Sequence, residues 1–246
     1  MKIKPQYIFS IILFVIFVGM LGFWFRHHVA DIFRFLFPNQ MMKRTVDDVL
    51  AEIGNDVKKR FLPQFEKAQV SYPPSHLTLV GFKAEKRLEV WGKKQGKWVF
   101  LWHYPILAAS GIAGPKLREG DRQVPEGLYQ LNFLNPNSRY HLSMQINYPN
   151  TFDRHKAALE QRTNLGGEIF IHGKAVSIGC LAIGDEAIEE LFVLVATIGM
   201  DNVTVIIAPQ QNMQNIQLID LKRPVRPWIS ELYVAIQQAL EPFQHP

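Results

Sequence analysis

The fold is indicated most clearly by residues 77–106, LTLVGFKAEKRLEVWGKKQGKWVFLWHYPI. Short runs of apolar, β-branched and aromatic residues alternate here with turn residues, a pattern typical of strands. Lys93-Lys94-Gln95-Gly96 lies between Trp91 and Trp98, so we expect a hairpin turn there. Further strands are predicted near 128–134, 140–146, 168–172 and 203–208. The sequence therefore predicts a mostly β domain.

Three helices are predicted around these strands. Thr45 is a good N-cap for the first helix, whose apolar residues recur at three- and four-residue spacings until Pro63. This amphipathic helix either packs on the domain or forms a stalk. A second helix is expected at 185–197, with Asp185 as its cap, and a third at 227–240. Together with the strands, these helices predict an α+β, mostly β fold.

An uncharged run, residues 7–25, precedes the folded part of the chain. As a helix it would be about 28 Å long, enough to cross the hydrocarbon core of a bilayer. It ends in bulky and polar residues rather than in a small-residue cleavage site. We expect an uncleaved anchor in 1–38, a helical neck in 39–70 and a catalytic domain in 71–246. The basic amino-terminal flank favours a periplasmic domain on a single-pass inner-membrane anchor; a cleaved, secreted form is the alternative.

The charge of the chain argues against nucleic acid as a partner. Of its 246 residues, 48 % are hydrophobic and 20 % charged, and the net charge is +5. Residues 1–40 carry four basic side chains and one acidic one, whereas the other 206 residues carry 23 basic and 21 acidic ones. No dense stripe of Lys and Arg follows the anchor, so a surface that neutralises phosphates is not expected.

Chemistry concentrates around the only cysteine, Cys180. A single cysteine excludes an internal disulfide. A predicted strand ends at His172, and Cys180 follows eight residues later, after Gly179. A thiol nucleophile needs a base within hydrogen-bond reach, and glycine lets the backbone approach a carbonyl. If the two side chains pair, we expect a lowered pKa for Cys180 and rapid alkylation below pH 7. A buried, inert thiol is the alternative.

The motif around this pair resembles a known signature. IHG followed by VSIGC resembles the H-G-x(n)-S-x-G-C pattern of the L,D-transpeptidase (YkuD) family, and IHG…VSIGCLAIGDEAIEELF is similar to its YafK-type branch. Pro125-Glu126-Gly127 matches a P-x-G motif, and YPNTFD, residues 148–153, matches a Y-P-N-x-x-D loop. The resemblance covers roughly residues 75–210. Ala182 stands where many members have arginine, and the gap between histidine and serine is shorter than in many members.

The resemblance implies a mixed β sandwich or barrel that acts on peptidoglycan stem peptides. It implies that Cys180 attacks a carbonyl at diaminopimelate, with His172 as general base and acid. Gly173 would orient His172, and the Gly179 and Cys180 N–H groups would form an oxyanion site. Ser177 either contacts substrate or forms a turn.

The sequence leaves three functions open: an L,D-transpeptidase, a hydrolase that releases a peptide or protein linked to diaminopimelate, and an inactive peptidoglycan-binding module. The weaker candidates for substrate binding are Lys116, Arg118, Tyr148 and Asn150. No metal-ligand spacing and no nucleotide-binding motif is present, so no metal and no cofactor is expected.

Overall fold

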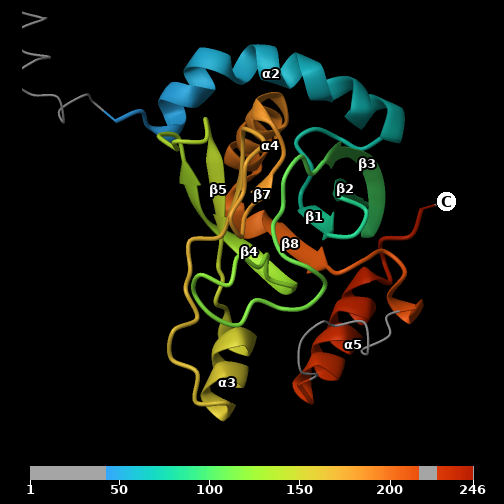
Figure 1. The fold of residues 1–246 in the computed structure, drawn as a ribbon. Coiled ribbons are helices and arrows are strands. Elements are labelled where there is room, and N and C mark those ends of the chain that lie inside the picture. Colours follow the sequence, from blue (N-terminus) through green and yellow to red (C-terminus); the bar gives the residue numbers. More distant parts are fainter. Residues whose placement is uncertain (1–42, 216–225, 246) are drawn as a thin grey trace, which may run out of the picture. The chain divides into compact units, whose positions relative to one another are not determined.

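The computed structural model describes residues 43–215 and 226–245, and the part from Arg44 onward forms one compact unit (Figure 1). The predicted anchor, residues 7–25, lies outside the described residues. Within the described ranges, no helix has the length and apolar character needed to cross a membrane.

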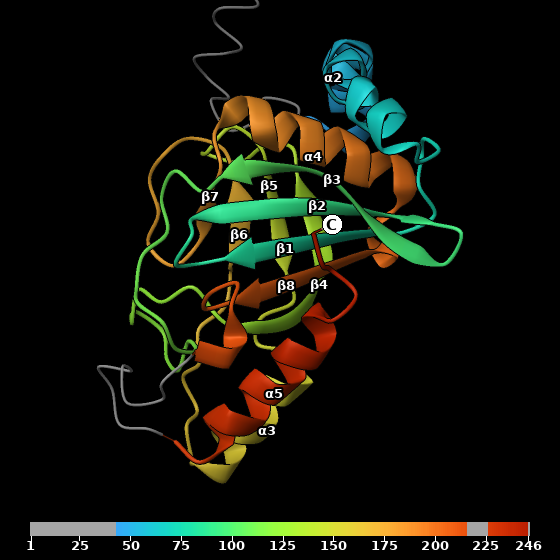
Figure 2. The same cartoon turned by 90° about the vertical axis from the view of Figure 1, so that its right-hand side faces the viewer.

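Among the described residues, eight strands form one mixed sheet in the order β3-β2-β1-β8-β4-β5-β6-β7 (Figure 2). The pairs β1–β8 and β6–β7 are parallel and the others antiparallel. The strands are β1 (Leu77–Phe82), β2 (Arg87–Lys94), β3 (Lys97–Pro105), β4 (Gly127–Asn135), β5 (Ser143–Ile146), β6 (Phe170–His172), β7 (Leu181–Ala182) and β8 (Val203–Ala208). The prediction of an α+β, mostly β fold is confirmed.

The sheet curls until its two ends meet. Ala108, three residues beyond the end of β3, forms an antiparallel bridge with Ala182 of β7. The N–H of Leu107 donates to the carbonyl of Ala182 at 2.8 Å, and the N–H of Ala182 donates to Ala108 at 3.0 Å. The result is a half-barrel that is joined at the β7 end, rather than a sandwich of two separate sheets.

The central strands are buried on both faces of the sheet. Leu77 and Leu79 of β1 pack into the larger hydrophobic cluster, while Val80 and Phe82 of the same strand pack into a second cluster. This alternation follows from the two-residue period of a strand. Helix α4 (Asp185–Ile198) covers the first face, and α5 (Trp228–Leu240) covers the second (Figure 2).

Helix α2 (Val46–Ala68) begins as predicted but ends later. A capping box between Thr45 and Asp48 fixes its start. The predicted end before Pro63 is wrong, because the helix continues through this proline for five more residues. Proline removes one helical hydrogen bond, but Phe61 and Phe65 on either side of it are almost fully buried. Their packing holds the helix together across the proline.

The same helix is packed on the domain rather than extended as a stalk. Phe61 stacks on Trp102 of β3 with ring centroids 6.3 Å apart, and Arg60 forms an ion pair with Glu189 of α4 at 2.6 Å. Helix α2 lies across α4 in Figure 1. These contacts make one face of α2 part of the hydrophobic core of the domain.

A buried carboxylate ties α5 to the long loop between β3 and β4. Glu126 accepts hydrogen bonds from the hydroxyl of Tyr233 at 2.9 Å, from the N–H of Gly114 at 2.7 Å and from the ammonium of Lys83 at 2.9 Å. Glu126 is the central residue of the Pro125-Glu126-Gly127 motif. The motif therefore fixes the loop that passes beside Cys180.

Candidate functional site

His172 is the last residue of β6, and its side chain is almost fully buried. Its ring Nδ1 lies 2.6 Å from the carbonyl oxygen of Gly173. A carbonyl can only accept a hydrogen bond, so Nδ1 carries the proton and Nε2 keeps its lone pair. Burial lowers the pKa of His172, and the hydrogen bond to Gly173 opposes this effect without cancelling it. The imidazole is therefore neutral at pH 7, with Nε2 able to accept a proton.

Cys180 immediately precedes β7, the strand that pairs with β6. The turn before it is closed by Ser177, whose Oγ accepts the N–H of Cys180 at 2.9 Å and donates to the carbonyl of Cys180 at 2.6 Å. Of the two roles that the sequence left open for Ser177, the structure shows the turn. The thiol is partly exposed, and its Sγ lies 3.8 Å from the carbonyl oxygen of Glu168.

The thiol is protonated at rest. Burial raises the pKa of Cys180 above its ordinary value, and the N–H of Phe170 and the charge of Lys116 lower it by less. No hydrogen bond joins Sγ to the ring of His172 in the described part of the chain. The expectation of a lowered pKa is therefore wrong, because it assumed a direct contact between the two side chains.

Two glycines of the motif are required by their surroundings. A Cβ atom at Gly173 would lie 2.6 Å from a carboxylate oxygen of Asp185 and 2.6 Å from the carbonyl oxygen of Tyr140. No larger residue fits there. Gly179 has a φ of +103°, a backbone conformation that other L-residues rarely adopt. Its N–H donates to Oγ of Ser110 at 2.6 Å.

Asp185 was predicted to cap α4, and this prediction is wrong. The N-cap is Gly184, which has no side chain to offer. Asp185 instead accepts hydrogen bonds from the N–H of Lys174 at 2.8 Å and from its ammonium at 2.5 Å. The carboxylate therefore closes the loop after His172, because β7 brings that loop next to the start of the helix.

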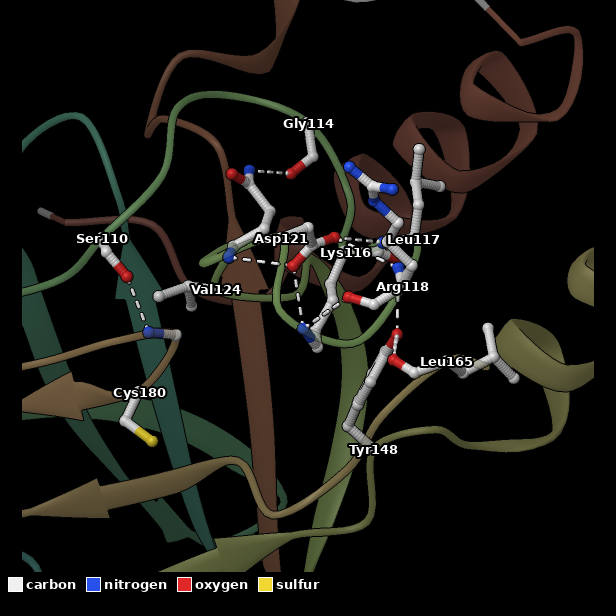
Figure 3. Close-up of polar contacts among 12 residues, drawn as sticks. Ser110, Gly114, Lys116, Leu117, Arg118, Asp121, Val124, Tyr148, Leu165 and Cys180 are labelled. Carbon is white, nitrogen blue, oxygen red and sulfur yellow. Dashed lines mark hydrogen bonds and ion pairs between the residues drawn. The ribbon is translucent and has the colours of Figure 1, made fainter. Parts of the chain in front are cut away.

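The loop that carries Lys116 and Arg118 passes beside Cys180 (Figure 3). Lys116 is buried, and its ammonium binds Asp121 at 2.8 Å and the carbonyl of Arg118 at 2.9 Å. The other oxygen of Asp121 accepts the N–H groups of Leu117 and Arg118. Lys116 is thus part of the loop's internal structure, whereas the side chain of Arg118 is exposed and points away from Cys180 in Figure 3.

Tyr148 and Asn150 stabilise local structure. The buried hydroxyl of Tyr148 donates to the carbonyls of Leu165 at 3.2 Å and Lys116 at 3.4 Å. Asn150 is the N-cap of α3 (Thr151–Leu159) and forms a capping box with Asp153. The predicted Y-P-N-x-x-D loop is therefore the start of a helix that the sequence analysis did not predict.

Sequence reasoning missed two residues that contact the motif around the pair, one at Gly179 and one at His172. Ser110 binds the N–H of Gly179, although the two are 69 residues apart in the chain. The ring of Tyr140 lies against that of His172, with centroids 4.6 Å apart. Ser110 lies in an irregular segment without periodicity, so its only available signal was its position after a predicted strand. Tyr140 was predicted to begin a strand at 140–146, but β5 begins only at Ser143. No group of three or more His, Cys, Asp or Glu side chains is placed to hold a metal ion among the residues described.

Comparisons with known proteins agree with the motif. The family model of the L,D-transpeptidase catalytic domain (YkuD) matches residues 78–207. YafK of Escherichia coli K12, a provisionally named L,D-transpeptidase, is 36 % identical over 148 residues, which are 58 % of this chain and 57 % of YafK. The chain thus spans less than two thirds of the length of that curated relative.

Similar solved structures include Pgp2 of Campylobacter jejuni, described as a helical cell shape determining protein. Pgp2 is 23 % identical with a TM-score of 0.46, over 56 % of this chain and 49 % of Pgp2. Bd1075 of Bdellovibrio bacteriovorus is 21 % identical with a TM-score of 0.42, over 69 % of this chain and 56 % of Bd1075. The family model itself covers more than half of the chain, from β1 to β8, and the chain therefore belongs to the L,D-transpeptidase catalytic domain family.

Proposed function

We propose that the protein is a cysteine acyltransferase that acts on peptidoglycan stem peptides at diaminopimelate. One observation carries this proposal. His172 is fixed in the tautomer that leaves Nε2 free to take a proton, at the end of β6, and the partly exposed thiol of Cys180 precedes the neighbouring strand β7. Family membership supplies the substrate class.

The reaction begins with a neutral thiol and a neutral imidazole. Substrate binding excludes water and brings the carbonyl to Sγ, as Nε2 of His172 accepts the thiol proton. Sulfur forms a bond to the carbonyl carbon, and the tetrahedral intermediate then loses its amine, which takes the proton back from His172. The thioester is resolved by an acceptor amine, which gives transfer, or by water, which gives hydrolysis.

The two N–H groups that would stabilise the oxyanion already have hydrogen-bond partners in the resting structure. The N–H of Gly179 is bound to Ser110, and that of Cys180 to Ser177. A developing oxyanion is a stronger acceptor than a neutral hydroxyl, so it displaces the oxygen of Ser110 from Gly179. Gly173 acts on His172 through its carbonyl, which holds Nδ1.

The test uses the full chain in detergent, incubated with tetrapeptide muropeptides and followed by mass spectrometry. Cross-linked dimers indicate transfer, and loss of a terminal residue or of an attached peptide indicates hydrolysis. His172→Gln keeps a polar side chain of similar size and should abolish turnover. The matched control is His155→Gln, because His155 is exposed on α3.

Failure of Cys180→Ala to abolish turnover would remove this mechanism. If the native protein binds muropeptides tightly without changing them, it is a binding module instead.

We also propose that residues 7–25 anchor the protein in the inner membrane, with the catalytic domain in the periplasm. The length of this uncharged run and its basic flank support the proposal. A reporter fused after Pro246 should be active outside the cytoplasm. Activity confined to the cytoplasm would reverse this topology, and a shortened amino terminus in the purified protein would indicate cleavage.

A further inference from the structure

A groove rich in arginine lies on one side of the site. Its volume is about 760 Å³, and two loops form its walls, at 117–122 and at 161–164. Four arginines line it: Arg118, Arg122, Arg162 and Arg226. The proposed chemistry at Cys180 uses none of them.

The positive charge of this groove is only partly balanced. Arg162 and Arg226 share one carboxylate, Glu160, at 2.7 and 2.6 Å. The carboxylate in the groove wall, Asp121, is bound by Lys116. The guanidinium groups of Arg118 and Arg122 have no carboxylate partner among the residues described, and both side chains are exposed. These two guanidinium groups can therefore bind an anion that is not part of this chain.

The groove is also connected to the thiol. Its second wall ends at Asn164, and the carbonyl of Glu168, four residues further on, contacts Sγ of Cys180 at 3.8 Å. Four residues span at most about 14 Å. The end of the groove at Asn164 thus lies within a few extended peptide residues of the nucleophile. Lys116, which directly precedes the first wall in the chain, carries a charge that acts on the same thiol.

We infer that this groove binds a carboxylate of the peptide whose carbonyl is attacked by Cys180, with Arg118 and Arg122 as the binding residues. The inference rests on the proposed function. An arginine guanidinium binds a carboxylate with two parallel hydrogen bonds, which fixes the direction of the peptide as well as its position. The groove thereby selects peptides that carry an acidic group a few residues from the reacting carbonyl.

The test measures binding in the full-length Cys180→Ala variant, so that turnover does not interfere. The probe is the peptidoglycan tetrapeptide, compared with the same peptide with its carboxylates amidated, by isothermal titration calorimetry. The free acid should bind about tenfold more tightly than the amide. Arg118→Gln combined with Arg122→Gln should remove this difference. The control variant, Lys86→Gln with Lys97→Gln, removes two exposed charges elsewhere and should preserve it.

Equal affinity for acid and amide would overturn the inference, as would an unchanged preference in the double arginine variant. If sulfate displaces the peptide only from proteins that have both arginines, the inference is supported. If sulfate binds but the protein shows no preference for the free acid over the amide, the groove is a site for free anions only and the inference is overturned. Turnover of the native protein is assayed separately. If the native protein shows no turnover while the Cys180→Ala variant still prefers the free acid, the proposed reaction is refuted and the inference about the groove stands.

Discussion

The protonated resting state of Cys180 predicts a specific alkylation profile. A cysteine with an ordinary pKa of about 8.5 is about 3 % thiolate at pH 7. Burial raises the pKa of Cys180, so its thiolate fraction at pH 7 lies below that figure. The rate of alkylation by iodoacetamide should therefore rise by more than about 25-fold between pH 7 and pH 9. In denaturant the single thiol should react faster at pH 7 than in the folded protein.

The assay follows the mass of the intact protein during a short exposure to the reagent at each pH. His172→Gln should leave this profile unchanged, because no hydrogen bond joins His172 to the thiol at rest, while it abolishes turnover. A rate that is already at its plateau below pH 7 would show a preformed thiolate. If His172→Gln then restored an ordinary titration, the pairing of Cys180 with His172 would be established and our account of the resting site refuted.

Three further predictions concern stability, each measured by urea unfolding. Phe61→Ala should lower the unfolding free energy by about 3–5 kcal/mol, because the ring is almost fully buried; a cost below 1 kcal/mol would show that α2 is dispensable. Burial raises the pKa of Asp153 to about 6, so its protonated carboxyl stabilises the folded state below about pH 4, and this stabilisation is lost as the pH rises towards 6. Asp153→Asn should abolish this loss of about 3 kcal/mol in unfolding free energy. An unchanged pH profile of stability in the variant would contradict the prediction. Ser110→Ala should cost about 1 kcal/mol by removing the partner of Gly179, with Ser110→Thr as the control; equal losses in both would exclude the hydroxyl as the cause.

Elements with a strong local pattern were predictable from the sequence. Strand β8 has the predicted bounds, α4 ends one residue later than expected, and Gln95-Gly96 forms the turn between β2 and β3. The two-residue strand β7 was not predictable, because so short a strand has no period. Its position depends on partners from β6 and from residue 108.

The site, too, was predictable where it depends on a local motif and not where it depends on tertiary contacts. The motif identifies Cys180 and His172, and their roles stay predictions until turnover is measured. It cannot show the distance between their side chains, which depends on how β6 and β7 are paired. It also cannot show that Lys116 is buried against Asp121 while Arg118 remains exposed. That difference arises from a loop whose conformation is held by hydrogen bonds to one carboxylate, Asp121.

The bridge between Ala108 and Ala182 has a consequence for the order of folding. The hairpin of β2 and β3 joins neighbouring segments, whereas this bridge joins residues far apart in the chain, and contacts of that kind form slowly because a long loop must close. The backbone around the nucleophile should therefore be completed after most of the sheet. The amide protons of Leu107 and Ala182 would then report, through hydrogen exchange, how often the folded protein opens at this end.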